Sequence, residues 1–215
     1  RRMSPDLKRR RVLLAAAAWL TATTAGRTAT LLTPTPPQTA GPFYPTEPPL
    51  DDDNDLTRVR GTDGIAQGRI TDLSGRLLDR NGRPISGARI EIWQCDATGR
   101  YHHPLDRRGA RDPRFQGFGH TVTDAEGRYR FRTIRPVPYP GRTPHIHVAV
   151  FPDGASPFTT QLYVAGEPRN AGDMLFNLIP ANQRSLVLAE FVPASNEGAE
   201  LAARFNIVLG GTPGA

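Results

Sequence analysis

Two segments decide the fold: "AQGRITDLSG", residues 66–75, and "GARIEIWQCD", residues 87–96. In both, apolar and polar residues alternate, and glycine, asparagine or proline stand at their ends. A period of two residues is typical of a half-buried β-strand, because successive side chains point to opposite faces of a sheet. Between the segments, Asn81-Gly82 predicts a tight turn. The first ordered unit is therefore predicted as strand, turn, strand.

The same pattern recurs through the rest of the chain. A Pro-Asp-Gly turn is predicted at 152–154, and the best short helical candidate is "PRNAGDMLFNLI", residues 168–179. Many short strands separated by turns indicate an all-β sandwich or barrel. The further predicted strands are "TVTDAEGRYRFRTI" (121–134, two strands joined at 125–127), "HIHVAVF" (145–151), "TTQLYV" (159–164), "RSLVLAEFVP" (184–193) and "ARFNIVLG" (203–210).

The net charge of +6 is confined to the N-terminal leader. Residues 1–27 hold seven basic residues against Asp6, so the other 188 residues are neutral. A basic protein that binds nucleic acid carries its charge on the folded domain. The arithmetic therefore predicts no nucleic-acid partner.

The leader resembles an export signal. "LKRRRVLLAAAAWLTATTAG", residues 7–26, places a basic cluster before a short apolar run, and Arg9-Arg10 matches a twin-arginine signal. The run is too short for a membrane span of ~20 apolar residues. We expect 1–27 to be the signal and the mature protein to be periplasmic or extracellular, with no stable membrane span. A basic helix that frays at the N-terminus is the alternative.

The remaining chain is predicted as a linker and one catalytic domain. The segment 28–38 is rich in Thr and Pro and reads as an extended linker. Residues 39–215 suit one domain, whose first part forms an arm laid over it, since Phe43 and Tyr44 would otherwise be exposed. The single cysteine, Cys95, can form no internal disulfide and is expected to be buried.

His145 and His147 raise the question of a metal. In a strand they project from one face, ~6.6 Å apart at the backbone, so their imidazoles can converge on one ion. Imidazole suits Zn, Cu, Fe and Ni alike, so the pair alone does not name the metal. The loop before the pair holds Tyr139 between two prolines, which restrict its backbone. Tyr101 follows the strand at 87–96.

At these residues the chain resembles the intradiol ring-cleavage dioxygenases of the protocatechuate 3,4-dioxygenase type. Those enzymes contain non-haem ferric iron on a β-sandwich, and the resemblance covers most of residues 38–170. It rests on four segments in the family's order: "QTAGPFYP" (38–45), "IEIWQCDATGRYHH" (90–103), "FRTIRPVPYPGRTPHIHVAVF" (131–151) and "TTQLYVAGEP" (159–168). The first matches the family's active-site arm, and the third its signature.

The resemblance implies an iron site and a substrate. The Fe(III) ligands would be Tyr101 and His145 equatorially and Tyr139 and His147 axially. Arg142 matches the arginine that stabilises negative charge on the substrate, and Gln161 a glutamine near the ligands. The arm residues that border the substrate pocket would be Thr39, Gly41 and Pro42. The implied reaction cleaves a catechol-type ring with O2 to a cis,cis-muconate-type product. Apart from the resemblance, an arm at 39–50 that packs on a second copy would give a homo-oligomer.

Some features depart from that pattern or stay outside it. The loop from Tyr139 to His145 is short, with Gly141 where protocatechuate enzymes tend to carry a tryptophan. The choice among catechol, protocatechuate and lignin-derived catechols therefore stays open. The charged run 106–114 reads as a solvated loop. The remaining histidines and tyrosines read as surface, structural or packing residues: His102, His103, His120, Tyr44, Tyr129 and Tyr163.

Two other classes of function remain to be weighed. An exported β-sandwich interaction module would explain the strands, but it leaves the two tyrosines and two histidines without a role. A zinc or copper hydrolase would use His145 and His147, and it needs a third His or carboxylate with one open position.

Overall fold

The computed structural model describes residues 30–47, 49, 51–195 and 197–211. The predicted export signal lies outside these residues, and so do 28 and 29 of the predicted linker. Within the described ranges, no helix is long and apolar enough to cross a membrane.

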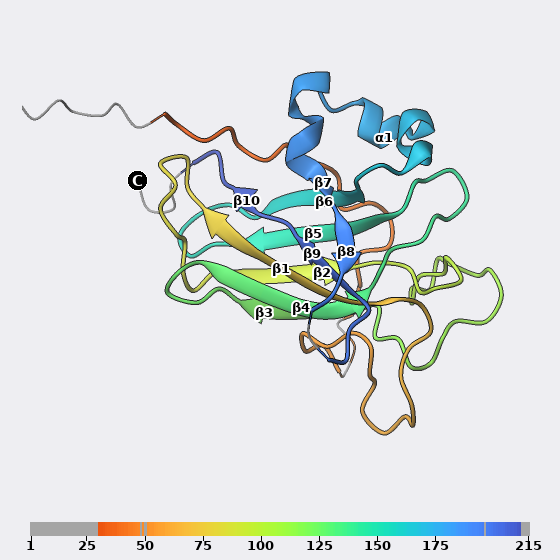
Figure 1. The fold of residues 1–215 in the computed structure, drawn as a ribbon. Coiled ribbons are helices and arrows are strands. Elements are labelled where there is room, and N and C mark those ends of the chain that lie inside the picture. Colours follow the sequence, from red (N-terminus) through yellow and green to blue (C-terminus); the bar gives the residue numbers. More distant parts are fainter. Residues whose placement is uncertain (1–29, 48, 50, 196, 212–215) are drawn as a thin grey trace, which may run out of the picture.

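The domain is a β-sandwich, as predicted (Figure 1). The first sheet has the order β10-β1-β9-β8, and its fifth strand, β4, pairs antiparallel with β1 along residues 70–76. The second sheet has the order β3-β2-β5-β6-β7. The strands are β1 (Ile70–Leu78), β2 (Arg89–Trp93), β3 (Phe118–Val122), β4 (Arg128–Ile134), β5 (His145–Phe151), β6 (Phe158–Val164), β7 (Leu188–Ala189), β8 (Phe191–Pro193), β9 (Leu201–Arg204) and β10 (Ile207–Val208).

The core lies between the two sheets. The first sheet contributes Leu73 and Phe131, and the second contributes Ile92, Ile146 and Val148, all at most 2% exposed. Each such side chain adds ~1.5–3 kcal/mol of hydrophobic stabilisation. β5 is buried on both faces. One face packs into the core between the sheets, and the other is turned away from that core, where a site can form.

Two predicted connections join different sheets. Turns form at Asn81-Gly82 and at 125–127, as expected, and Gly82 and Gly127 adopt positive φ angles of 78° and 69°. However, β1 and β4 belong to the first sheet, whereas β2 and β3 belong to the second. A turn signal fixes the reversal of the chain, but it does not fix which sheet the next strand joins.

The prediction that residues 184–193 form one strand is wrong. Residues Ala181–Val187 form a 3-10 helix (η2), β7 then joins the second sheet, and β8 joins the first. The apolar letters "LVLA" are too few to show a period that separates helix from strand. The short helical prediction at 168–179 is confirmed by η1 (Pro168–Gly172) and α1 (Met174–Asn177).

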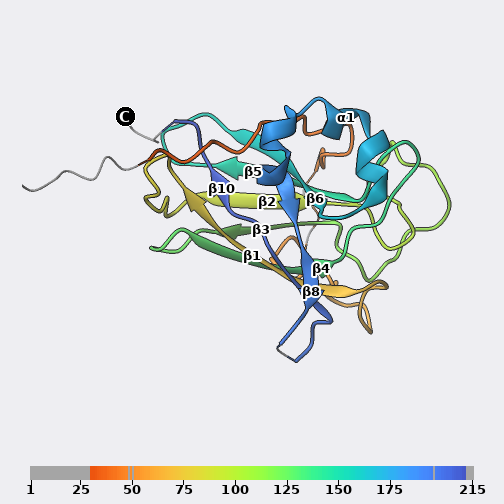
Figure 2. The ribbon, with the colours of Figure 1, turned by 45° about the horizontal axis from the view of Figure 1, so that its top comes forward.

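The described part of the predicted linker is extended and attached to the domain. The backbone NH of Thr35 donates to Val208 O at 2.9 Å, and that of Gln38 donates to Thr159 O at 2.8 Å. In Figure 2 this segment runs in orange beside β6 and under the helical segment that contains α1. The arm that follows therefore starts from a fixed point at the edge of the second sheet.

Candidate active site

The site is built on β5, on the face of the second sheet turned away from the core. In the sheet register, His147 lies between Trp93 of β2 and Gln161 of β6, and His145 lies opposite Tyr163. The Nε2 atoms of His145 and His147 are 3.2 Å apart. The Trp93 indole stacks on the His147 ring, with centroids 4.9 Å apart and planes inclined by 6°. The strand therefore presents both imidazoles on one face, as the sequence predicts.

Both imidazoles are neutral and buried. Burial, aided by the Arg142 charge, lowers the pKa of His145 to about 3. Burial and the neighbouring His145 lower that of His147 well below its usual range. His145 Nδ1 lies 2.7 Å from Thr143 O. A carbonyl oxygen only accepts, so Nδ1 carries the proton and Nε2 keeps its lone pair. His145 Nε2 is thus available to a cation.

Two phenols complete the group. Tyr101 Oη lies 3.5 Å from His145 Nε2. The rings of Tyr101 and Tyr139 meet edge to face at 5.4 Å, and the Tyr139 ring centroid lies 5.5 Å from that of His145. Without a cation, burial raises the pKa of Tyr101 well above its usual value and raises that of Tyr139 as well. The structure thus brings all four predicted ligands together.

A tight turn delivers Tyr139 and Arg142 to the site. The backbone NH of Arg142 donates to Tyr139 O at 2.9 Å, and Gly141 has a φ of 82°. Proline followed by glycine with positive φ is the pattern of a type II turn. The two side chains therefore leave a rigid four-residue unit beside the N-terminal end of β5.

The loop of Tyr101 is fixed by buried carboxylates. Asp106 accepts a hydrogen bond from the backbone NH of Tyr101 at 2.9 Å. Gly99, with φ 79°, approaches the other tyrosine loop so closely that a Cβ there would lie 2.9 Å from Pro138 O. Only glycine permits this approach, so Gly99 holds the two tyrosine loops against each other.

These four donors fit a ferric ion. Two imidazole nitrogens that bind one metal ion at ~2.1 Å each lie ~3.0–3.4 Å apart for ligand angles of about 90–109°, and the 3.2 Å between the histidine Nε2 atoms lies within this range. Phenolate is a hard anionic donor suited to ferric iron, and a bound cation favours the ionised phenol. No group of three or more His, Cys, Asp or Glu side chains that could hold a metal occurs among the described residues. The tyrosines are therefore essential to this donor set.

Arg142 lies beside the four predicted ligands, and neighbouring side chains hold its guanidinium. Its Nε donates to Asp173 Oδ2 at 2.8 Å, and its Nη2 donates to Gln161 Oε1 at 2.7 Å. Its Nη1 lies 3.4 Å from His145 Nε2. Gln161, predicted near the ligands, is fully buried and hydrogen-bonds the arm, since its Nε2 donates to Thr39 O at 3.0 Å.

The arm lies over the site. A Cβ on Gly41, whose φ is 70°, would lie 3.3 Å from His147 Cε1. Phe43 stacks on Tyr101 with ring centroids 4.5 Å apart. Thr39 and Pro42 are exposed. The structure therefore brings Thr39 and Gly41 to the site through Gln161 and His147.

Comparisons with known proteins agree with this geometry. The family model described as "Dioxygenase" matches residues 39–211. The chain belongs to the intradiol ring-cleavage dioxygenase family.

The matching proteins are dioxygenases by name. The protocatechuate 3,4-dioxygenase beta chain of Burkholderia cepacia is 40% identical over 169 residues, which cover 74% of this chain and 72% of that one. A hydroxyquinol 1,2-dioxygenase of Rhodococcus opacus is 33% identical, over 64% of this chain and 49% of its own length. A dioxygenase domain from Streptomyces sp. SirexAA-E has a TM-score of 0.65 and 34% identity, with 84% and 100% of the two chains covered. The protein is accordingly an aromatic ring-cleaving dioxygenase by family.

Some residues of this intradiol dioxygenase differ from the prediction. The run 106–114 is not simply a solvated loop, because Asp106 and Asp112 are 3% and 5% exposed and accept backbone hydrogen bonds. Tyr163 does more than pack, since its hydroxyl donates to Gln161 and accepts from Gln38 at 3.0 Å.

The other residues set aside in the sequence have structural surroundings. His120 lies within β3 and contacts Asp52 O at 2.7 Å. His103 Nδ1 accepts from the backbone NH of Leu105, and Cys95 is buried with a free thiol, as expected. Tyr44 packs edge-on against Trp93 at 4.9 Å. Among the described residues, no hydrogen bond or ring contact joins any of these side chains to His145 or His147.

No pattern in the sequence pointed to Asp173. Its carboxylate is buried and accepts a hydrogen bond from Arg142, which lies 31 positions earlier in the chain. A charged residue in a short polar segment is normally expected at the surface. Trp93 was likewise expected only as part of a strand, although the period of two does place it on the same face as the residue opposite it in β5.

Proposed function

We propose that this chain is an Fe(III)-dependent intradiol dioxygenase that cleaves a catechol-type ring with O2 to a cis,cis-muconate-type product. One observation carries the proposal: two phenols and two imidazoles converge on one point. The Nε2 atoms of His145 and His147 are 3.2 Å apart, and Tyr101 Oη lies 3.5 Å from His145 Nε2. Tyr101, Tyr139, His145 and His147 would hold the iron. When bound there, ferric iron would activate the catechol ring toward O2 without an external electron donor.

The protein's own residues would bind the substrate and move its protons. Tyr101 and Tyr139 offset two of the three positive charges when they ionise. Tyr139 is half-buried, so its phenolate can turn away from the ligand set and accept a catechol proton. Arg142 carries its charge next to His145 and would stabilise the negative charge that develops on the ring oxygen. The arm through Thr39, Gly41 and Pro42 would border the pocket and exclude water.

The substrate class follows from the relatives and the short turn. The relatives are named for protocatechuate and hydroxyquinol, both of them hydroxylated aromatic rings. Gly141 is exposed and a Cβ there would meet no atom within 4 Å, so the short turn places no side chain beside Tyr139 that would exclude a ring substituent. We propose a catechol that carries a substituent on this side. The chain spans about half the length of the hydroxyquinol relatives it matches.

Colour and oxygen uptake test the proposal. Protein expressed with sufficient iron should be burgundy, with a broad visible band that changes when catechol is added without oxygen. A panel of catechol, protocatechuate and lignin-derived catechols, assayed for O2 uptake and ring-opened product, then identifies the substrate. Colourless, iron-free protein from iron-replete cells would overturn the proposal.

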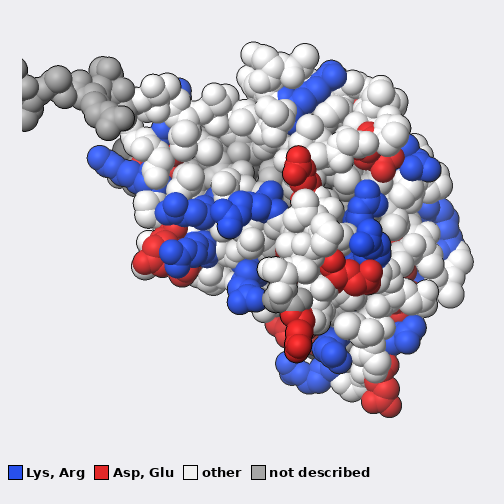
Figure 3. Space-filling view, in the orientation of Figure 1, with Lys and Arg blue, Asp and Glu red and all other residues white. Residues whose placement is uncertain are grey.

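The alternatives have less support. A hydrolase that uses zinc or copper requires a third His or carboxylate, and the described residues offer no such group around the two histidines. An interaction module without catalysis leaves four converging ligand-type side chains without a role, and the family match does not favour it. Figure 3 shows basic and acidic side chains interspersed on the visible face, in keeping with a neutral domain.

We also propose export by the twin-arginine route and assembly into a homo-oligomer. The basic cluster before the apolar run supports the first. Two Burkholderia cepacia relatives are named as the beta chain and the alpha chain of one dioxygenase, which supports assembly of some kind; a homo-oligomer is our proposal for this chain. Export should fail when Arg9 and Arg10 are both replaced by lysine, and continued export would refute this route. Light scattering of the iron-loaded protein tests the assembly.

A further inference from the structure

Asp173 lies where helix α1 meets the loop that leads into β5. Its side chain is completely buried. One oxygen, Oδ1, accepts the backbone NH of Phe176 at 2.9 Å and caps helix α1. The other, Oδ2, accepts the backbone NH of Thr143 at 2.9 Å and Arg142 Nε at 2.8 Å. A single carboxylate thus joins the helical segment to the loop that leads into β5.

This carboxylate balances the charge of Arg142 and fixes the orientation of its guanidinium. No other carboxylate among the described residues lies within ion-pair distance of the guanidinium. The arginine side chain is 13% exposed, and a charge that is so poorly hydrated needs a partner. The remaining acceptors, Gln161 Oε1 at 2.7 Å and Tyr163 Oη at 3.4 Å, are neutral. They fix the far edge of the planar group, whereas Asp173 fixes the Nε edge.

The hydrogen bonds also keep Asp173 ionised. Burial raises the pKa of this carboxyl, but the bonds from Phe176, Thr143 and Arg142 outweigh burial and lower it. The fixed guanidinium turns Nη1 toward His145 Nε2, at 3.4 Å. A guanidinium is a planar fork, so its angle decides which oxygen it can reach.

We propose that Asp173 is a positioning residue that holds the Arg142 guanidinium at the angle needed to stabilise charge on the bound catechol. This inference rests on the proposed function. Asp173 would not touch the substrate or the ligand set, and it would act only through Arg142.

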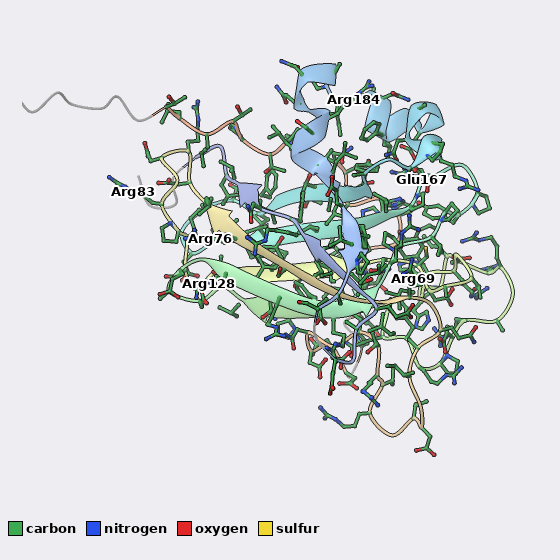
Figure 4. The ribbon with its side chains drawn as sticks, in the orientation of Figure 1. Arg69, Arg76, Arg83, Arg128, Glu167 and Arg184 are labelled. Atoms are coloured by element: carbon green, nitrogen blue, oxygen red, sulfur yellow. The ribbon has the colours of Figure 1, made fainter. Side chains whose placement is uncertain are left out.

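Asp173→Asn is the informative change. Asparagine is nearly isosteric and is itself a good helix N-cap, so the cap of α1 can persist. However, the amide nitrogen then faces either Phe176 NH or, in the flipped orientation, both Thr143 NH and Arg142 Nε, and the charge partner is lost. Glu167→Gln is the matched control, because Glu167 caps η1 in the same helical segment and pairs with Arg169 at 3.1 Å. Figure 4 shows Glu167 at the edge of this segment.

The experiment combines Asp173→Asn with Arg142→Gln in a double-mutant cycle on the iron-loaded full chain. Catechol affinity without oxygen, measured by calorimetry, and kcat/KM are compared for the wild type, both single variants and the double variant. We expect Asp173→Asn to lower kcat/KM at least about tenfold and to weaken catechol binding, with iron content unchanged. In the Arg142→Gln background it should cause almost no further loss, since coupled residues are not additive. Glu167→Gln should match the wild type.

The outcomes separate this inference from the proposed function. Full activity of Asp173→Asn, or an equal loss in both backgrounds, overturns the positioning role while an active wild type keeps the proposed function. A wild type that neither binds catechol nor consumes O2 overturns both. Loss of iron from Asp173→Asn also overturns the inference, because the residue would then act on the ligand set.

Discussion

Asp106 should stabilise the fold by an amount that depends on pH. It accepts hydrogen bonds from the backbone NH of Tyr101 and from Nε and Nη2 of Arg108, at 2.9, 2.9 and 2.6 Å. Burial raises the pKa of the Asp106 carboxyl, but these bonds outweigh burial and lower it from 3.8 to about 2. In the unfolded chain the group binds a proton at higher pH than in the folded state, so its contribution is complete above 3.8 and is lost as pH falls toward 2.

The expected magnitude follows from that pKa. A fall from 3.8 to about 2 corresponds to about 2 kcal/mol at pH 7 and to about 1 kcal/mol at pH 3. Solvent around Arg108, whose side chain is 44% exposed, makes these upper figures. Asp106→Asn should therefore lower the free energy of unfolding, and the difference from the wild type should shrink by about 1 kcal/mol between pH 7 and pH 3.

Urea unfolding of the chelator-treated proteins at pH 7, 5 and 3 measures this difference. The control is Leu105→Ala, in the same loop, because Leu105 is 66% exposed and carries no titratable group. Its effect should be small at every pH. A difference between the wild type and Asp106→Asn that stays constant or grows toward pH 3 would refute the electrostatic argument.

Three shorter predictions concern the site. Tyr139→Phe should keep its iron but slow catechol binding at least ~tenfold, because the displaceable base is lost; anaerobic stopped-flow spectra with unchanged rates would contradict this. Gly41→Ala should lower Tm by ~2–4 °C from positive-φ strain and also lower kcat/KM, because its Cβ meets His147 at 3.3 Å. Gly154→Ala, with φ 69° and no atom within 4 Å, should show the strain alone, so equal kcat/KM losses would disprove the contact. Burial holds the pKa of His145 at about 3, whereas the unfolded chain takes up the proton near 6.5. The free energy of unfolding of the chelator-treated protein should therefore fall by about 2 kcal/mol as pH falls from 7.5 to 5. An equally steep fall in His145→Gln would rule this out.

The strands of the sandwich were predictable because their side chains alternate. "HIHVAVF" is strand β5 over the predicted residues, 145–151, and "TTQLYV" differs from β6 by one residue. The pattern of 184–193 misled because a short apolar run serves a 3-10 helix, β7 and β8 in turn. Which sheet each strand joins was not predictable from local pattern, because it depends on pairings between distant segments.

The four proposed metal ligands could be found in the sequence for a different reason. Residues two apart on a strand point to the same face, so His145 and His147 could be predicted to lie close together. Their Nε2 atoms are 3.2 Å apart. Tyr101 and Tyr139 came from a resemblance of motifs. Nothing in the spacing of 101, 139 and 145 shows that these side chains meet, because long loops connect them.

Buried acids explain what sequence reasoning missed. Asp106, Asp112 and Asp173 are charged letters in polar runs, and such letters are usually exposed. Each is buried because it receives backbone NH groups or an arginine that would otherwise be unsatisfied in the folded chain. Such a role depends on a partner brought from a distant or turning segment, so it becomes visible only when the fold is known. The same reasoning applies to Tyr163, whose hydroxyl accepts a hydrogen bond from Gln38, at the end of the predicted linker, and donates one to Gln161. The residues that fix the site are thus harder to predict than the residues that form it, and Asp173 is where that difference can be measured.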